Sequence, residues 1–161
     1  MSVAFRRDSD EEHREPKFER PIPPGPNLVT ERGLALVGER IAALEAQLAA
    51  AANDETTRAP LQRDLRYWHA RQVSAELAPL PAGDKVEFGV AVTFRLRGRE
   101  QAFRLVGDDE ADPAAGLLSF NAPLARAMLG AEPGDRLPFA GEDEAIEIVA
   151  VSGGRAGPAS E

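Results

Sequence analysis

Residues Val106–Gly134 have the sequence VGDDEADPAAGLLSFNAPLARAMLGAEPG, and this stretch decides the fold. The apolar run before it ends at Val106. Gly107 and the acids that follow predict a loop, because glycine and clustered polar residues interrupt regular structure. Residues 117–120 form a second apolar run, short enough for a strand. The stretch therefore predicts a strand, an acidic loop and a second strand.

A short helix is predicted directly after the second strand. Asn121 is a candidate N-cap, and Pro123 suits the first turn because proline has no amide hydrogen to leave unsatisfied there. Gly130 is expected to end the helix. The residues predicted to share its apolar face are Leu124, Ala127 and Met128.

Several blocks of this stretch carry a family resemblance. V-G-D-D-E-A-D, G-L-L-S, A-P-L-A-R-A-M-L-G and P-G-D resemble, in order and spacing, the C-terminal domain of the bacterial Gre (GreA/GreB) transcription elongation factors. Leu28-Val29-Thr30 followed by Gly33 resembles the start of that family's N-terminal coiled coil. The resemblance implies an α+β protein, with an antiparallel helical hairpin followed by a small FKBP-like antiparallel β domain with one short helix.

Composition excludes several classes of protein. The 161 residues include no cysteine, so disulfides, thiolate metal sites and cysteine nucleophiles are impossible. No apolar run approaches the roughly 18 residues of a membrane span, and the charged N-terminus is unlike a signal peptide. We therefore expect a cytoplasmic protein, and we expect it to be a monomer.

The negative charge is concentrated towards the C-terminus. Net charge is −8, and residues 80–152 carry seven basic and thirteen acidic side chains. Phosphate backbones repel such a surface, so no autonomous nucleic-acid binding is expected. A basic protein partner is favoured, and the resemblance identifies it as RNA polymerase.

The chain divides into four predicted segments. Residues 1–27 mix both charges with five prolines and few apolar groups, which predicts a disordered tail. Phe5 and Phe18 are either anchors that order on a partner or parts of an inert tail. Residues 28–79 are predicted to form the helical hairpin, residues 80–152 the β domain, and residues 153–161 a frayed end.

Two apolar stripes predict the hairpin. Thr30 is a plausible N-cap of the first helix, and the polar residues 53–57 break the pattern. Candidate caps for the second helix are Asn53, Thr56 and Thr57. Pro60 is expected in the first turn of that helix, and Pro79 and Pro81 are expected to end it. The stripes consist of Leu34, Val37, Ile41, Leu44 and Leu48, followed by Leu61, Leu65 and Trp68.

Alternation predicts the sheet. Gly83 to Arg97 is predicted to form an entry turn and a strand, because every second residue from Val86 to Leu96 is apolar, which is typical of a strand with one buried face. Gly98 is expected to turn the chain into a second strand at residues 102–106. Residues 137–139 and 145–151 supply the last strands. The alternating residues are Val86, Phe88, Val90, Val92, Phe94 and Leu96.

The resemblance also implies how such a protein works. Gre factors dock the globular domain on the rim of the polymerase secondary channel and pass the coiled coil down it. The candidate polymerase-binding residues are Asp109, Glu110, Asp112, Asn121, Pro123, Leu124 and Arg126. Asn121 and Ala122 stand where the family commonly has Asp or Ser and then Ser. Arg126 is either an interface residue or a partner in an internal ion pair.

The hairpin tip departs from the family. Acidic tip side chains in Gre factors help hold a second metal ion at the polymerase active centre, which promotes cleavage of backtracked RNA. Only Asp54 and Glu55 stand at the predicted tip, and adjacent side chains point in different directions. Each arm is about three turns short, on the order of 16 Å less reach. We therefore expect an elongation regulator with little or no cleavage stimulation.

That regulator is expected to be an accessory factor rather than an enzyme, and to have no cofactor of its own. The Mg²⁺ of the polymerase becomes relevant only if the tip acids reach it. No metal site is expected, because His13 and His69 lack a nearby second ligand and residues 108–112 lack the spacing of a calcium loop.

Two alternatives stay open. In the first, Asp54 and Glu55 make the protein a transcript-cleavage factor. In the second, the FKBP-like resemblance indicates a prolyl isomerase or chaperone. The aromatic residues available for that activity are Phe88, Phe94, Phe103, Phe120 and Phe139, most of them at positions expected to be core.

Overall fold

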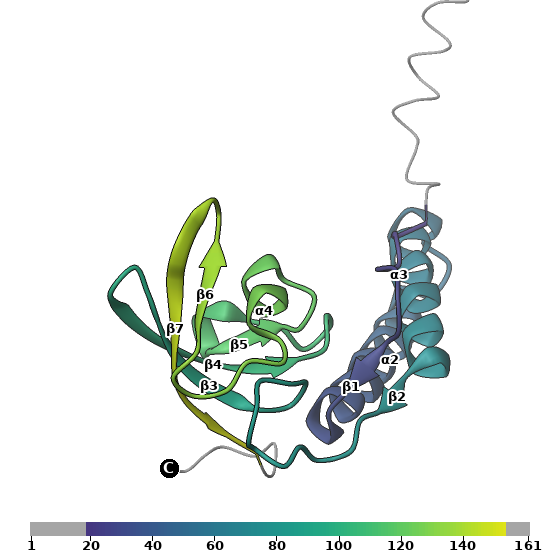
Figure 1. The fold of residues 1–161 in the computed structure, drawn as a ribbon. Helices are drawn as coiled ribbons and strands as arrows, with labels where there is room; N and C mark the ends of the chain where they lie inside the picture. The colour runs from purple at the N-terminus through teal and green to yellow at the C-terminus, as the bar shows by residue number, and fades with distance from the viewer. Residues whose placement is uncertain (1–18, 154–161) are drawn as a thin grey trace, which may run out of the picture. The chain divides into compact units, whose positions relative to one another are not determined.

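The computed structural model describes residues 19–153 (Figure 1). Those residues fall in two compact units, one holding residues 38–73 with the segment that ends at Pro24, the other holding residues 25–37 and the chain from Ser74 onward. The predictions for residues 1–18 and 154–161, including Phe5, Phe18 and the frayed end, lie outside the described residues. The elements are β1 (Leu28–Val29), α2 (Glu31–Ala51), α3 (Glu55–Ser74), β2 (Glu76–Leu77), β3 (Ala91–Leu96), β4 (Arg99–Val106), the 3-10 turn η1 (Pro113–Ala115), β5 (Leu117–Ser119), α4 (Pro123–Met128), β6 (Arg136–Phe139) and β7 (Glu142–Ser152).

The predicted apolar stripes are confirmed on α2 and α3, which lie side by side in Figure 1. Ile41 and Trp68 are buried, and the remaining stripe residues of residues 38–73 are half-buried. The Arg58 guanidinium donates hydrogen bonds to the carbonyls of Leu48 (2.9 Å) and Ala52 (3.0 Å), which ties the start of α3 to the end of α2. The helical hairpin is therefore held by its own seam and by this arginine.

Three predictions about the second helix are wrong. Its cap is Asp54, because the Asp54 carboxylate accepts from the amide and the hydroxyl of Thr57, and none of Asn53, Thr56 and Thr57 caps it. Starting the helix at Glu55 puts Pro60 sixth in α3, beyond the first turn. The helix also ends at Ser74, ahead of the prolines, because residues 76–77 pair in parallel with β1.

The second unit contains a five-stranded sheet in the order β5-β4-β3-β7-β6. The hairpin between β3 and β4 is confirmed, and both turn residues, Arg97 and Gly98, have positive φ (52° and 83°), as a tight two-residue turn requires. β4 and β5 pair in parallel, so the sheet is mixed where an antiparallel sheet was predicted. Parallel neighbours need a crossover, and residues 107–116 with η1 provide it.

The first predicted strand is shorter than its alternating pattern. β3 begins at Ala91, and the residues before it form turns around Gly89, whose φ is 93°. Val86 and Val90 are nevertheless buried, so the alternation reflects loop valines directed into the core. Phe88 is not in the sheet and packs edge-to-face on Phe120, with ring centroids 5.1 Å apart.

The core of the sheet unit lies between the sheet and α4 (Figure 1). Met128 and Ala125 of α4 are fully buried against sheet residues such as Phe94. The left-handed Gly130 (φ 86°) follows the end of the helix, as predicted. The α+β class, with two helices followed by a sheet domain, is confirmed. No helix within residues 19–153 is long and apolar enough to cross a membrane.

Candidate functional site

The two sequence blocks that carry the family resemblance meet at a buried carboxylate. Thr30 caps α2, because its hydroxyl oxygen accepts from the Gly33 amide at 2.9 Å. The same hydroxyl donates to Glu110 Oε1 at 2.7 Å, and Arg32 Nη1 donates to Glu110 Oε2 at 2.8 Å. We name Thr30, Arg32 and Glu110 the carboxylate clamp. It places a negative charge at the positive end of α2, which stabilises the helix terminus.

Two glycines allow the clamp to close. A Cβ built at Gly33 lies 2.8 Å from Glu110 Oε1, closer than real Cβ contacts come. A Cβ at Gly107 collides with the carbonyl oxygen of Leu28. Both glycines are therefore required by close approach between the start of α2 and the acidic loop.

The clamp corrects one predicted contact. Glu110 was expected on an acidic surface that faces the polymerase, but it is only 6% exposed and both its oxygens are bonded within the chain. Asp109 is half-buried and Asp112 is exposed. The backbone of Asp112 pairs with Leu117, and this pairing closes the loop.

A second carboxylate orients Asn121. Asp108 Oδ1 accepts from the Ser119 hydroxyl at 2.6 Å, and Asp108 Oδ2 accepts from the Asn121 side-chain amide at 3.0 Å. The predicted cap is therefore wrong, because the Asn121 amide is directed to Asp108 and Ala122 occupies the N-cap position without a side-chain bond. Pro123 opens the helix as predicted. Asp108 thus fixes the chain just before α4.

The outer side of α4 is exposed beside the core. Pro123 and Arg126 are exposed, and Leu129, directly after the helix, is 43% exposed. Arg126 makes no ion pair with any of residues 19–153, so the internal ion pair considered for it is absent from this part of the chain. Leu124 is half-buried against the core. We name Pro123, Arg126 and Leu129 the α4 face.

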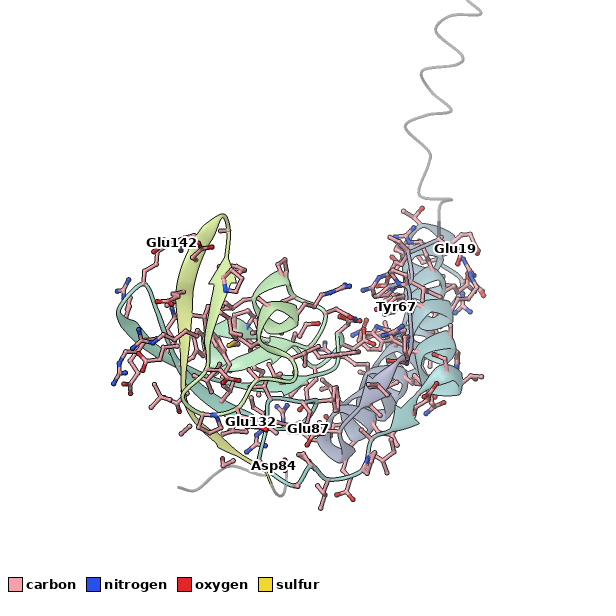
Figure 2. The ribbon with its side chains drawn as sticks, viewed as in Figure 1. Glu19, Tyr67, Asp84, Glu87, Glu132 and Glu142 are labelled. Carbon is pink, nitrogen blue, oxygen red and sulfur yellow. The ribbon has the colours of Figure 1, made fainter. Side chains whose placement is uncertain are left out.

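Three acidic residues lie in or close to the segment that follows α4. Figure 2 shows Asp84, Glu87 and Glu132 near one another, and backbone bonds join Val86 to Gly130 and Ala131. The α4 face therefore presents one arginine and two apolar residues in a domain with an excess of acidic side chains.

The tip acids have different environments. Both are exposed, but the Asp54 carboxylate is occupied as the cap of α3, with Thr57 Oγ1 donating to Oδ2 at 2.7 Å. The Thr57 hydroxyl, followed by its backbone amide, holds the pKa of Asp54 below its ordinary value. Near the tip, Gln47, Ala50, Ala51, Thr57, Pro60 and Leu61 line an open hollow of about 480 Å³.

Capping by Asp54 predicts a pH-dependent hairpin. Because the pKa is lower in the folded state, the stabilisation is present above the ordinary aspartate pKa of about 3.9 and is lost as pH falls through the lowered value. Asp54→Ala is expected to lower the Tm of the helices by about 2–4 °C at neutral pH. Asp54→Asn, which caps without titrating, should flatten the acid dependence of helix melting followed by circular dichroism. Identical acid profiles for Asp54→Asn and the unmodified chain contradict the capping role.

The described residues contain no group of three or more His, Asp or Glu side chains arranged to hold a metal ion. His69 is exposed on α3. No pattern in the sequence predicts that Thr30 and Arg32 bind Glu110, that Asp108 orients Asn121, or that Leu129 is exposed. One feature of the sequence could have indicated the clamp: the L-V-T-x-x-G and G-D-D-E blocks, which supply its residues, both resemble segments of the same family.

The sheet domain is similar to known proteins. The family model described as "Transcription elongation factor, GreA/GreB, C-term" matches residues 80–153. The transcription elongation factor GreA of Thioalkalivibrio sulfidiphilus is 44% identical over 80 residues, which is 47% of this chain and 51% of that protein. The one from Allorhizobium ampelinum is 40% identical over 77 residues, 45% of this chain and 49% of that protein.

The chain thus spans about half the length of these curated relatives. A solved structure of the prokaryotic transcription elongation factor GreA/GreB from Nitrosomonas europaea covers 78% of this chain and 98% of its own, with 21% identity and a TM-score of 0.37.

Proposed function

We propose that this chain is a transcription elongation factor of the GreA/GreB type, because residues 80–153 match the model of that family's C-terminal domain, and that it binds RNA polymerase at the secondary channel and regulates elongation. It acts as an accessory factor and catalyses no reaction itself. The sheet domain docks through the α4 face, and the helical hairpin provides the second contact.

The observation that carries the docking proposal is the unpaired Arg126 on the α4 face. The domain around it has an excess of acids, yet this guanidinium makes no ion pair within residues 19–153. Exposed Pro123 and Leu129 flank it. Arginine beside apolar side chains is typical of residues that contribute most to a protein interface. Asp108 supports the face by fixing Asn121 at the start of α4.

Little or no stimulation of transcript cleavage is proposed. Asp54 is occupied by its bonds to Thr57, which leaves Glu55 as the tip carboxylate without a capping role. A catalytic metal ion takes several oxygen ligands at about 2.0–2.6 Å, and this tip has only one carboxylate without a capping role to add to those of the polymerase. Unchanged RNA in a backtracked polymerase complex after addition of this protein is the expected result. Shortened RNA that disappears with Glu55→Ala favours the cleavage alternative.

Co-purification with core RNA polymerase tests the docking. We expect the unmodified chain to be retained and Arg126→Glu to lose binding by about tenfold or more, since a charge reversal opposes a complementary surface. Arg99→Glu is the matched control, because Arg99 is also exposed and lies on the β3–β4 hairpin away from α4. Equal retention of both variants, or no retention of the unmodified chain, contradicts the proposal.

A further inference from the structure

Residues 19–24 run alongside α3 in Figure 1, and their arginine lies on an aromatic pair. Tyr67 and Trp68, the only tyrosine and tryptophan of the sequence, pack edge-to-face with centroids 5.1 Å apart. The Arg20 guanidinium carbon lies 4.0 Å from the Tyr67 centroid and 5.7 Å from the Trp68 centroid. A guanidinium within about 6 Å of a ring face is attracted by its π electrons.

A carboxylate on α3 and another on the segment add ion pairs to this contact. Arg20 Nη1 lies 3.5 Å from Asp64 Oδ1 on α3. One residue earlier, Glu19 accepts two bonds from Arg66, from Nε at 2.9 Å and from Nη2 at 2.8 Å. Figure 2 labels Glu19 and Tyr67 on this part of the molecule. Two arginines therefore hold the segment: its own Arg20 contacts α3, and Arg66 of α3 binds Glu19 of the segment.

The sequence of the segment suits an extended ligand. It reads E-R-P-I-P-P. Because its prolines restrict φ, the segment loses less conformational entropy when it binds to the surface of α3. Its apolar side chain contributes little, because Ile22 is 52% exposed. Attachment therefore depends chiefly on Arg20 and Glu19.

We propose that Tyr67, Trp68 and Asp64 form a guanidinium-binding site on α3, and that residues 19–24 are a releasable strap that fills it through Arg20. Tyr67 and Trp68 are about nine-tenths buried, and Arg20 is one of the side chains that lie on their rings. The anchoring ion pairs are exposed, with side-chain exposures of 56% for Glu19 and 59% for Arg66. Exposed pairs are weak and screened by salt, so the strap opens at high ionic strength.

Protonation of Glu19 is also expected to release the strap. The hydrogen bond from Arg66 lowers the pKa of Glu19, and Arg63 adds a smaller effect. The other charges at this contact are Arg20, Asp64, and the guanidinium groups of Arg40 and Arg71, which lie 5.7 Å from the Trp68 centroid and 6.0 Å from the Tyr67 centroid, respectively. A lowered pKa means that the contact is fully present above the ordinary glutamate pKa and weakens as pH falls through the lowered value.

Trp68 reports the opening directly, because it is the only tryptophan. In the full chain, Arg20→Ala is expected to shift Trp68 emission to the red and to increase its quenching by acrylamide, while circular dichroism stays helical. A peptide of residues 17–26 added to this variant should reverse the change, and the same peptide with alanine in place of arginine should not. Arg99→Ala, in the sheet domain, should behave as the unmodified chain.

The outcomes that overturn the proposal are specific. Unchanged emission and quenching in Arg20→Ala show that the strap does not cover the site, and equal rescue by both peptides shows that the site does not select a guanidinium. If Arg20→Ala loses helix content, the unmodified chain in about 1 M KCl and the milder Glu19→Gln take its place, since salt at that level leaves a Debye length of about 3 Å. If Trp68 emission shows no red shift in about 1 M KCl or in Glu19→Gln, the proposal of a releasable strap is wrong. All these measurements use the free protein, so they stand apart from polymerase binding.

Discussion

Gly33→Ala is expected to destabilise the sheet unit by about 2 kcal/mol, although alanine is the better helix former. The added Cβ lies 2.8 Å from Glu110 Oε1, and that carboxylate cannot withdraw without losing its bonds to Thr30 and Arg32. Hydrogen bonds to charged groups contribute about 1.5–3 kcal/mol each, which exceeds the gain in helix propensity of about 1 kcal/mol. Amide hydrogen exchange of β3 and β4 measures the effect, because Trp68 lies in the other unit.

Gly38→Ala is the matched control in the same helix. Nothing lies within 4 Å of a Cβ at that position, so the substitution should stabilise the chain by up to about 1 kcal/mol. In a Glu110→Ala background the loss of stability caused by Gly33→Ala should shrink or change sign. The carboxylate that the added Cβ would meet is then absent. A destabilisation by Gly33→Ala that is independent of Glu110 refutes the clamp as its cause.

Met128→Ala is expected to destabilise the sheet unit by about 3 kcal/mol, since deleting a buried methionine costs both its burial and the cavity that remains. Met128 is fully buried between α4 and the sheet. The neighbouring Leu129 is 43% exposed, so Leu129→Ala should cost less than about 1 kcal/mol. Denaturant unfolding followed by circular dichroism compares the two. Equal losses contradict the assignment of α4 as an anchored helix with an exposed outer side.

Local patterns in the sequence predicted most of the elements. Apolar spacing located α2 and α3, Thr30 was identified as a cap, and the Gly98 turn placed the β3–β4 hairpin. These features depend on residues within a few positions of one another. Where several polar residues compete locally, as at residues 53–57, the sequence did not distinguish Asp54 from its neighbours.

Long-range contacts leave no local pattern in the sequence. Thr30 and Glu110 are 80 residues apart, and no local pattern shows that the glutamate turns inward to the start of α2. Asn121 looks like a helix cap until Asp108, 13 residues earlier, takes its amide. The parallel pairing of β4 and β5 likewise depends on the path of the acidic loop. Such contacts are set by tertiary packing, which overrides local preference.

Equilibrium binding to core RNA polymerase, measured for variants of the α4 face and of the tip, tests the central claim most directly. Arg126→Glu should raise the Kd by about tenfold or more, equivalent to roughly 1.4 kcal/mol, whereas the double variant Asp54→Ala and Glu55→Ala should bind almost as the unmodified chain does. Docking through the α4 face thus predicts a larger loss of affinity for Arg126→Glu than for the double tip variant. Binding that is lost with the tip variant and unaffected by Arg126→Glu contradicts it.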